Sequence, residues 1–590
     1  MAARVAATAR AGAPASAPGR TRTLAVALAV ALVTFLVFRG ALGHSFVDWD
    51  DMQYVVENPV VLAKSPLGCL RAVVETQYHP LTLLSLAMNV STPLSPRPFI
   101  ATSLVLHVAD TLLVLWFVFL ISGRRLGVAA AVALLFGIHP LHVESVAWVS
   151  GRKDVLYTLF FLLGAIDYWR YLETGERVRL WTSLAACVLA CLAKPMAMVF
   201  PAAMVLLDLW CRRAPFTRAA LIEKLPFLVV AGITVFVAWR VQNGGDLGGL
   251  LWRLHPAPAA AGIRPDLTPL DRVTLPLYGP AMTAWRMVVP LGLCAYYPFP
   301  SPNEPRTFAF LVAPVVVLAM VALAVWDLRR SRALTFGFGW FLAHLAPTLP
   351  FVLLGGFIMA DRYSYLSSVG LLFAAAMAVD SWLKGMSAPR RAVWVPVLAC
   401  AGAAFALWLF VLARTQVEVW RDSETLWSRA LAVHPRLAPA YVYRGKQRAL
   451  AGRNDAALVD FRSALALGLE SADVYQGLGA LYGSRGALDS ALVWLDHAVA
   501  LAPDRPGVLY NRAITRLALG RAGEAVADLD RALALAPSSA ELHAARGQAR
   551  LALGDSTGAA EDFRRAQDQG RKIGMPPPPA PGAGRPERKE

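Results

Sequence analysis

Two adjacent carboxylates, Asp50 and Asp51, follow the first long apolar run of the sequence, in Phe46-Val-Asp-Trp-Asp-Asp-Met-Gln-Tyr54. Repulsion between neighbouring carboxylates raises the pKa of one of them, which is one way to make a base that works near neutral pH. A carboxylate just outside a membrane is a candidate general base for a lipid-linked substrate. A solvated turn or a helix cap is the plainer interpretation. The long loop also holds polar and aromatic runs such as Tyr78-His-Pro-Leu81, so we favour the catalytic interpretation.

A second polar cluster runs from His139-Pro-Leu-His-Val-Glu144 to Gly151-Arg-Lys-Asp154. Its two histidines and one glutamate invite a metal site, but they are spaced across a proline without the pattern of a zinc protease, so we predict no metal. We expect Glu144 to be an acceptor-binding or supporting acid, and Arg152 and Lys153 to bind phosphate or pyrophosphate. Anchoring of the next membrane segment at the interface is the alternative.

Two further cations lie at expected membrane edges. Arg362, in Ala360-Asp-Arg-Tyr-Ser-Tyr-Leu-Ser-Ser368, has no basic neighbours. An arginine in such a place is costly unless it meets a partner, which is either a lipid phosphate or Asp361 beside it. Lys194 is either a ligand of the donor phosphate or an anchor at the membrane surface.

The composition indicates which elements must position these residues. Of 590 residues, 57% are hydrophobic and 16% charged, which predicts a polytopic membrane protein with a soluble part. The net charge of +17 comes largely from arginines in short loops between apolar runs. Such loops indicate membrane topology, so we expect no nucleic-acid partner. The six cysteines are scattered and predict neither a disulfide framework nor a zinc site.

Counting the basic loops predicts the membrane topology. A basic N-terminus over residues 1–22 precedes an uncleaved anchor and lies in the cytoplasm, with a cleaved signal peptide as the alternative. The apolar segment 273–293, within the outer loop 241–306, is assigned to the membrane interface. If this segment crossed the membrane, the basic loop at 329–332 would lie on the outer side, against the positive-inside rule. Loop 43–98 and all the polar clusters then share one outer face. About eleven spans are predicted, at about 23–42, 99–121, 126–141, 154–172, 180–193, 196–210, 225–240, 307–327, 333–354, 365–383 and 392–413.

The C-terminal part repeats every 34 residues in the tetratricopeptide pattern, with repeats set at 438, 472, 506 and 540. We therefore predict an all-α chain with a membrane module at 23–414, repeats at 419–573 and a disordered tail at 574–590. The groove of such repeats binds peptide or protein, with a spacer or dimerisation arm as the alternative. Arginines that recur in the first helices either line this groove and favour acidic ligands or form a solvated face: Arg444, Arg448, Arg512, Arg516, Arg546 and Arg550.

The ordered motifs resemble the transmembrane and tetratricopeptide repeat-containing (TMTC) family, which is related to protein O-mannosyltransferases. The resemblance spans residues 22 to about 570. It implies a GT-C glycosyltransferase fold, a polyprenyl-phosphate sugar as donor, no tightly bound cofactor, and inverting transfer of a sugar such as mannose to an acceptor hydroxyl. The motifs that carry it are Trp49-Asp-Asp51 with Asn58 downstream, Tyr78-His-Pro-Leu81, His139-Pro-Leu-His-Val-Glu144, Gly151-Arg-Lys-Asp154, Leu192-Ala-Lys194 and Asp361-Arg-Tyr-Ser-Tyr-Leu366.

By this resemblance Asp50 is the catalytic base, Asp51 its partner and Glu144 a supporting acid. Arg362 is the implied ligand of the donor phosphate, and Arg152, Lys153 and Lys194 are further candidates. His79, His142, Asp154 and Asp361 are implied on the acceptor side or as supporting residues. The chain departs from the pattern where Asp361 replaces a frequent Glu and where Lys153 stands at a position that is commonly small or acidic.

The Ala- and Arg-rich composition suggests a bacterial genome, and hence the inner membrane, extracytoplasmic repeats and an undecaprenyl donor. We expect transfer to Ser or Thr of an exported protein that the repeats recruit, at a membrane surface that also supplies the lipid-linked sugar. Two alternatives stay open. One is glycosylation of a lipid or an envelope glycan, and the other is a non-catalytic membrane scaffold.

Overall fold

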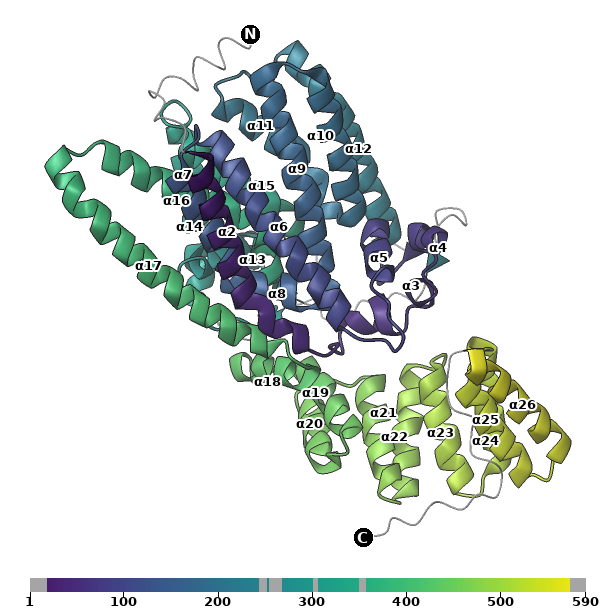
Figure 1. Cartoon of the computed structure of the whole chain (residues 1–590). Helices are drawn as coiled ribbons and strands as arrows, with labels where there is room; N and C mark the ends of the chain where they lie inside the picture. Colours follow the sequence, from purple (N-terminus) through teal and green to yellow (C-terminus); the bar gives the residue numbers. More distant parts are fainter. Residues whose placement is uncertain (1–18, 243–251, 254–267, 301–305, 350–356, 573–590) are drawn as a thin grey trace. The chain divides into compact units, whose positions relative to one another are not determined.

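The computed structural model describes residues 19–242, 252–253, 268–300, 306–349 and 357–572. The chain divides into two compact units, one ending at Val433 and the other beginning at His434 (Figure 1). Both are built almost entirely of helices, so the predicted all-α class is confirmed. Most of the basic N-terminus and the tail at 574–590, which was predicted to be disordered, lie outside the described residues.

Each predicted membrane span coincides with a helix of the first unit. Apolar runs of this length form helices in a bilayer because every backbone polar group is then satisfied within the segment. The helices are α2 (Arg20–Phe38), α6 (Arg97–Ile121), α7 (Leu126–Ile138), α9 (Arg152–Thr174), α10 (Arg177–Ala193), α11 (Phe200–Trp210), α12 (Arg218–Gln242), α14 (Phe308–Asp327), α15 (Ala333–Leu345), α16 (Ser364–Lys384) and α17 (Ala388–Val419).

The number of full spans is smaller than the eleven predicted. Among the described residues, six helices are long and apolar enough to cross a membrane. A seventh candidate is α7 together with the segment Pro140–Ala147, which is bent by 54°. The chain is therefore a multi-pass membrane protein. The remaining predicted spans fall on helices that are too short or, as in α9, that begin with charged residues.

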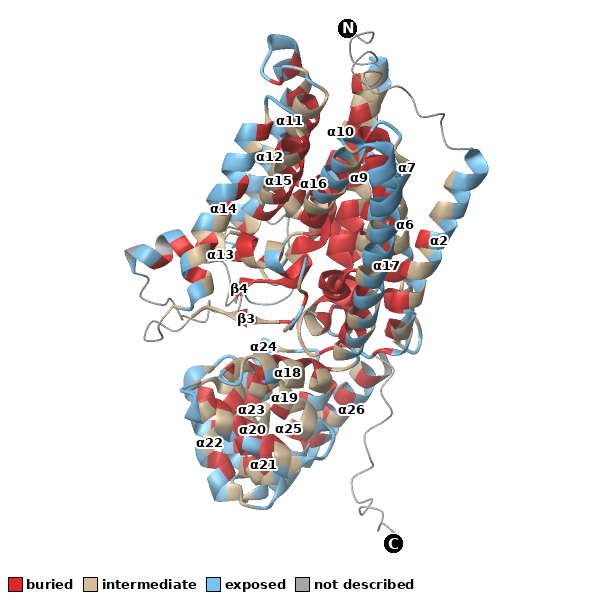
Figure 2. Cartoon of the chain, turned by 90° about the vertical axis from the view of Figure 1, so that its left-hand side faces the viewer, coloured by how far each residue is buried: buried red, intermediate tan, exposed pale blue. Residues whose placement is uncertain are grey.

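The burial pattern separates an inner group of helices from a lipid-facing group. Buried residues gather around α6, α9, α15 and α16, whereas α12, α14 and α17 are largely exposed (Figure 2). In an apolar 18-residue stretch of each spanning helix, 61% of the residues are buried in α6 and 6% in α17. Exposed apolar helix faces suit hydrocarbon, so α17 has the surface of a helix at the edge of the bundle.

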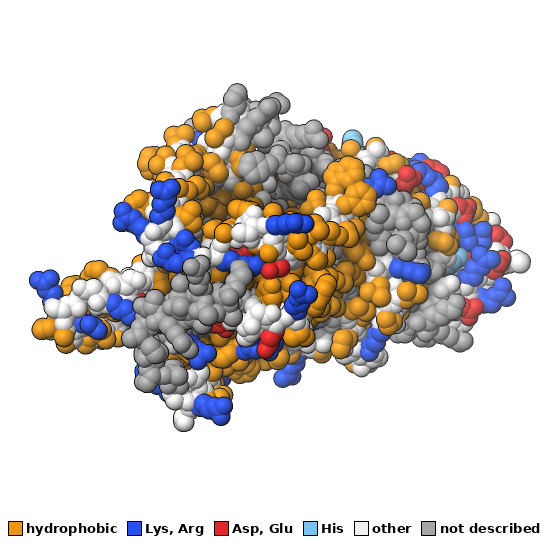
Figure 3. Space-filling model, turned by 90° about the horizontal axis from the view of Figure 1, so that it is seen from above, with side chains coloured by type: hydrophobic (Ala, Val, Ile, Leu, Met, Phe, Trp, Pro, Cys, Tyr) orange, Lys and Arg blue, Asp and Glu red, His pale blue; other side chains and the backbone are white. Residues whose placement is uncertain are grey.

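Basic side chains mark the ends of the spanning helices. Seen from above, Lys and Arg lie among hydrophobic side chains (Figure 3). Several of them are neutralised by neighbouring acids, as in the ion pair of Arg125 with Asp380 at 2.6 Å and that of Arg213 with Glu223 at 2.6 Å. Ion pairs therefore fix the positions of these two arginines.

The segment 273–293 forms helix α13 (Pro269–Arg286), which is not among the helices apolar enough to span. A capping box between Thr268 and Asp271 fixes its start. Polar Asp271, Thr274 and Arg286 are buried while Leu270, Val273 and Trp285 are exposed, so the helix is amphipathic and its exposed face is apolar. Its predicted interfacial position stays a prediction.

Short strands and one-turn helices connect the long helices. Strand β1 (Ala72–Val73) pairs in parallel with β2 (Trp252–Arg253), and β3 (Tyr297–Pro298) pairs antiparallel with β4 (Phe357–Met359). These pairs join the loop 43–98 and the segment before α16 to described parts of the segment 241–306. The remaining short elements are η1 (Arg39–Gly43), η2 (Met52–Val56), α3 (Pro59–Leu62), α4 (Pro66–Arg71), α5 (Pro80–Ala87), η3 (Pro140–His142), α8 (Val143–Ala147), η4 (Val149–Gly151), η5 (Pro195–Val199), η6 (Ala346–Thr348), η7 (Asp361–Tyr363) and α18 (Ser423–Val433).

The second unit consists of helix pairs that begin at the predicted positions 438, 472, 506 and 540. Small alanines where the paired helices meet, such as Ala457 and Ala491, are fully buried, which allows close packing. The helices are α19 (Ala438–Leu450), α20 (Asn454–Ala466), α21 (Ala472–Ser484), α22 (Leu488–Leu501), α23 (Pro506–Ala518), α24 (Ala522–Leu535), α25 (Ala540–Ala552) and α26 (Ser556–Lys572).

The recurring arginines of the repeats are paired with buried acids. Arg512 makes two bonds to Asp528, at 2.9 and 2.7 Å, and Arg516 makes a third at 2.8 Å. The same arrangement surrounds Asp460 and Asp562 in the first and fourth repeats. These arginines hold the two helices of a repeat together, with two guanidinium groups on each of these aspartates. That these arginines line the groove and favour acidic ligands stays a prediction.

Candidate active site

Asp51 is an internal connector in this structure. One carboxylate oxygen accepts the backbone N–H of Val47 at 3.0 Å, and the other accepts both the N–H and the hydroxyl of Ser150, at 2.9 and 2.6 Å. Burial raises the pKa of Asp51 to about 7, although these hydrogen bonds oppose the shift. Asp51 thereby fixes the loop 43–98 to the turn before α9.

Asp50 lies in a different environment from its neighbour. Its side chain is 24% exposed, against 1% for the whole of Asp51. The Nζ of Lys153 lies 3.2 Å from the Oδ2 of Asp50, and also 4.8 Å from the ring centroid of Tyr54 and 5.4 Å from that of Trp148. Asp50 is therefore the member of the pair that is open to a substrate, and Lys153 orients it.

A second ion pair joins Asp154, in the first turn of α9, to Lys194, between α10 and η5. Both side chains are buried, and the Nζ of Lys194 also lies 5.7 Å from the ring of Tyr157 and 5.8 Å from that of Tyr363. Burial lowers the pKa of Lys194 and the carboxylate of Asp154 opposes this. The pair lies at the same end of α9 as Asp50, because Asp154 directly follows Lys153, the partner of Asp50.

A third ion pair joins Glu144, on α8, to Arg362, on η7. Glu144 also accepts the backbone N–H of Arg362 at 2.9 Å. Asp361, which was the competing partner for Arg362, instead accepts the hydroxyl of Tyr297 at 2.8 Å and lies 3.7 Å from Arg286. The two neighbours in sequence thus bind different partners.

Aromatic rings bring the three ion pairs into one cluster. The guanidinium carbon of Arg362 lies 5.6 Å from the Trp148 ring, which Lys153 also approaches. It also lies 5.2 Å from the Tyr363 ring, which Lys194 approaches. Three cations are therefore held near the exposed carboxylate of Asp50, each with its own acid. Such a site suits a reaction that removes a proton and releases a phosphate.

His79 lies beside this cluster. It stacks on the ring of Tyr54 with 6.1 Å between ring centroids, and its Nε2 lies 2.7 Å from the side-chain oxygen of Gln77. Burial and the charges of Lys153 and Lys194 hold the pKa of His79 well below its usual value, so the ring is neutral. A neutral imidazole can support an acceptor hydroxyl but adds no charge.

His142 and Arg152 are packed into the protein. His142 bonds the carbonyl of Phe136 at 2.7 Å and the hydroxyl of Ser368 at 3.2 Å. Arg152 is fully buried. Its guanidinium donates to the side chains of Ser85, Asn89 and Ser103 and to the carbonyl of Phe99, at distances from 2.5 to 2.9 Å. The guanidinium of Arg152 therefore has protein hydrogen-bond partners on several sides and joins the segments that carry them.

The sequence interpretation missed Glu75. A tight turn, in which Val74 N–H donates to the carbonyl of Gln77 at 3.0 Å, gives Glu75 and Thr76 positive φ angles of 51° and 62°. Such angles are strained for a β-branched residue. Burial and Asp50 raise the pKa of Glu75, while Lys153 lowers it. Glu75 is therefore within electrostatic range of Asp50 and Lys153, and its sequence context carried no signal.

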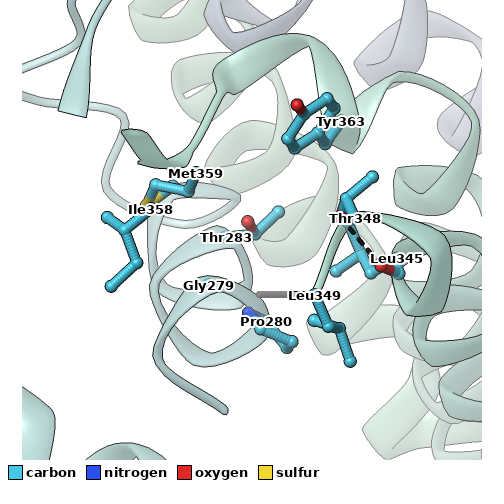
Figure 4. Close-up of a pocket in the computed structure, with 9 residues that line it drawn as sticks. All are labelled: Gly279, Pro280, Thr283, Leu345, Thr348, Leu349, Ile358, Met359 and Tyr363. Atoms are coloured by element: carbon cyan, nitrogen blue, oxygen red, sulfur yellow. Dashed lines mark hydrogen bonds between the residues drawn. The ribbon is translucent and has the colours of Figure 1, made fainter. Parts of the chain in front are cut away.

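Two other features bear on what the site can hold. Among the described residues, no group of three or more His, Cys, Asp or Glu is arranged to hold a metal ion. A cavity between α13 and η6 lies next to Tyr363 (Figure 4). Its volume of about 10 Å³ is room for one water molecule, so it holds neither sugar nor lipid in this conformation.

Comparison with known proteins supports the family resemblance. No family model matches the chain. It is 25% identical over 499 residues to the protein O-mannosyl-transferase TMTC1 of Homo sapiens, covering 76% of this chain and 55% of that protein. It is 27% identical over 492 residues to TMTC4 of Homo sapiens, covering 72% and 64%. The predicted resemblance to TMTC proteins is thus confirmed, and the chain spans little more than half the length of these relatives.

Similar solved structures cover about a quarter of this chain. A crystal structure of MamA matches with 19% identity and a TM-score of 0.24, covering 27% of this chain and 87% of that one. The tetratricopeptide protein YrrB, described as having an unusual peptide-binding site, matches with 21% identity and a TM-score of 0.23, covering 25% and 76%.

Proposed function

We propose that this chain is a membrane glycosyltransferase that moves a sugar from a polyprenyl-phosphate donor to a Ser or Thr hydroxyl of an exported protein. The observation that carries the proposal is the separation of the two adjacent carboxylates. Asp51 is tied into the protein by Ser150 and Val47, while Asp50 is open and lies beside Lys153. The names of the TMTC relatives support this reaction class and mannose as the sugar.

Asp50 acts as the general base in this reaction. It takes the proton of the acceptor hydroxyl as the hydroxyl oxygen bonds to the anomeric carbon of the sugar. The bond from that carbon to the phosphate oxygen breaks on the opposite face, and the lipid phosphate leaves with the electron pair. The configuration is inverted, and the proton rests on Asp50. Positioned proton transfer of this kind contributes roughly 10²- to 10⁴-fold to a rate.

The departing phosphate is stabilised by Lys153, Lys194 and Arg362. Each of these cations has a fixed carboxylate partner, so it is oriented before substrate arrives. Preorganised charge of this kind stabilises a developing anion without reorganisation during the reaction. Arg152 ranks behind them, because its guanidinium is already engaged by the protein.

The reaction takes place on the outer face of a bacterial inner membrane, and the donor is a sugar linked to undecaprenyl phosphate. The support for this side is the count of basic loops, which puts the N-terminus in the cytoplasm and loop 43–98 outside. The repeats recruit the acceptor protein to the same side. Their fold, a stack of helix pairs, is of the kind that offers a groove to peptides.

The proposal is tested by intact-mass profiling of envelope proteins from cells with the chain, without it, and with Asp50→Asn. We expect hexose-sized mass increments that vanish in both the deletion and the Asp50→Asn strain. Glu57→Gln, an exposed acid of the same loop, is the matched control and should keep the increments. Transfer that survives Asp50→Asn at the wild-type level would rule out the assigned base.

A further inference from the structure

Three arginines from separate elements line one groove outside the site described above. They are Arg39 on η1, Arg97 at the start of α6 and Arg414 near the end of α17. The groove has a volume of about 580 Å³. We propose that it binds the phosphate head group of a membrane lipid, independently of the Asp50 site.

The charge of the groove is not neutralised by the protein. Among the described residues, none of the three arginines has a carboxylate within ion-pair distance, and Arg414 donates only to the backbone carbonyl of Leu36 at 3.0 Å. Glu418 lies beside the groove, where its carboxylate oxygen would be 3.4 Å from a Cβ at Gly40. Three positive charges therefore face at most one negative charge.

This absence of partners distinguishes the groove from two other places in the bundle where an arginine lies at the end of a helix. Arg125 follows the far end of α6 and pairs with Asp380 at 2.6 Å. Arg179, at the start of α10, pairs with Asp167 at 3.1 Å. In both places a carboxylate neutralises the guanidinium, whereas among the described residues the three arginines of the groove have no carboxylate within ion-pair distance. A convergent set without acids is suited to a phosphate, which guanidinium groups bind in a bidentate manner.

The surroundings of the groove indicate that the phosphate belongs to a lipid. Phe35, one helical turn from Arg39 along α2, lines the groove and is 42% exposed. On α17, Leu407 and Val411 precede Arg414 and are 63% and 51% exposed. On both helices these exposed apolar side chains lie between the arginine and the middle of the span. Acyl or prenyl chains can follow them while the head group stays at the arginines.

The proposal is tested on the purified full-length chain in a neutral detergent, by native mass spectrometry with added lipids. The probes are phosphatidylglycerol, undecaprenyl phosphate, a diacylglycerol that lacks phosphate, and inorganic phosphate. We expect the phosphate-bearing lipids to bind at least ten-fold more tightly than diacylglycerol. The tighter binder of phosphatidylglycerol and undecaprenyl phosphate identifies the class of lipid that supplies the head group.

The variant Arg39→Gln with Arg97→Gln and Arg414→Gln should lose at least ten-fold in affinity for that lipid. Arg71→Gln removes one charge from the first outer loop without touching the groove, and should change nothing. The single variants Arg39→Gln and Arg97→Gln remove exposed side chains, so they should fold even where the triple variant does not, with about three-fold weaker binding each. Unchanged binding in the folded variants, equal binding of diacylglycerol, or equally tight binding of inorganic phosphate would each overturn the proposal.

Discussion

The ammonium group of Lys153 lies 3.2 Å from a carboxylate oxygen of Asp50, a residue 103 positions earlier in the chain. The contact joins the first turn of α9 to the loop 43–98. Because the Lys153 side chain is only 5% exposed and lies against two aromatic rings, it has little freedom to move away. Asp50 is therefore presented to substrate by a fixed partner.

Removal of this partner should impair the reaction more than the fold. We expect Lys153→Met to lower the rate of sugar transfer by about 10²-fold, the size typical for one preorganised electrostatic group. Lys153→Arg, which keeps the charge, should restore part of the rate. The measurement is transfer to an acceptor peptide by purified chain. Lys64→Met, at an exposed lysine of the same loop, serves as the control, and an equal loss there would contradict a specific role for Lys153.

The stability of the chain should depend on pH through Asp51. Its pKa is raised to about 7 in the folded state, whereas an aspartate in an unfolded chain titrates near 4. The folded state therefore holds this proton more tightly. The stabilisation is complete below about pH 4, decreases as the pH rises toward 7, and is lost above that.

The comparison that isolates this effect is wild type against Asp51→Asn, with melting temperatures measured from pH 4 to pH 8. The excess stability of the wild type should fall between pH 4 and pH 7 and be constant above pH 7. Groups that titrate equally in both proteins cancel in the difference. A difference that does not change with pH would show that Asp51 is ionised throughout.

The buried pair of Glu144 and Arg362 allows structural and functional roles to be separated. Glu144→Gln leaves the Arg362 guanidinium buried without its acid, which should lower the free energy of unfolding by about 3–5 kcal/mol. The double variant Glu144→Gln with Arg362→Gln removes both charges and should recover most of that loss. If Arg362 binds the donor phosphate, the double variant stays inactive although it is stable. Recovery of transfer together with stability would assign the pair to the fold alone.

In the repeats, the buried aspartate that two arginines share should contribute more to stability than an exposed aspartate that pairs with one of those arginines. Asp528 is buried between Arg512 and Arg516, so Asp528→Asn should destabilise the third repeat by about 3 kcal/mol. Asp496 pairs with the same Arg512 but is half exposed, and Asp496→Asn should cost less than about 1 kcal/mol. Hydrogen exchange of α23 and α24 in the full chain measures both changes. Equal protection of these helices in the two variants would contradict the larger role assigned to Asp528.

Local patterns predicted most of the fold. The 34-residue period gave the starts of the helix pairs at 438, 472, 506 and 540, because each repeat buries the same positions against its neighbour. Apolar runs gave the helices of the membrane module for a similar reason. The number of full spans was harder to predict, since the breaks at Lys194 and His139 depend on the polar groups that those residues meet.

The sequence by itself determined that an Asp-Asp pair, three further cations and the repeats occur in one membrane chain, because composition and periodicity are properties of neighbouring residues. Only the tertiary structure decided that Asp51 faces Ser150 while Asp50 faces Lys153, and that Arg362 pairs with Glu144 and not with Asp361. These pairs join residues about 100 to 218 positions apart. Adjacent side chains therefore differ in burial and charge for reasons that no short stretch of sequence contains.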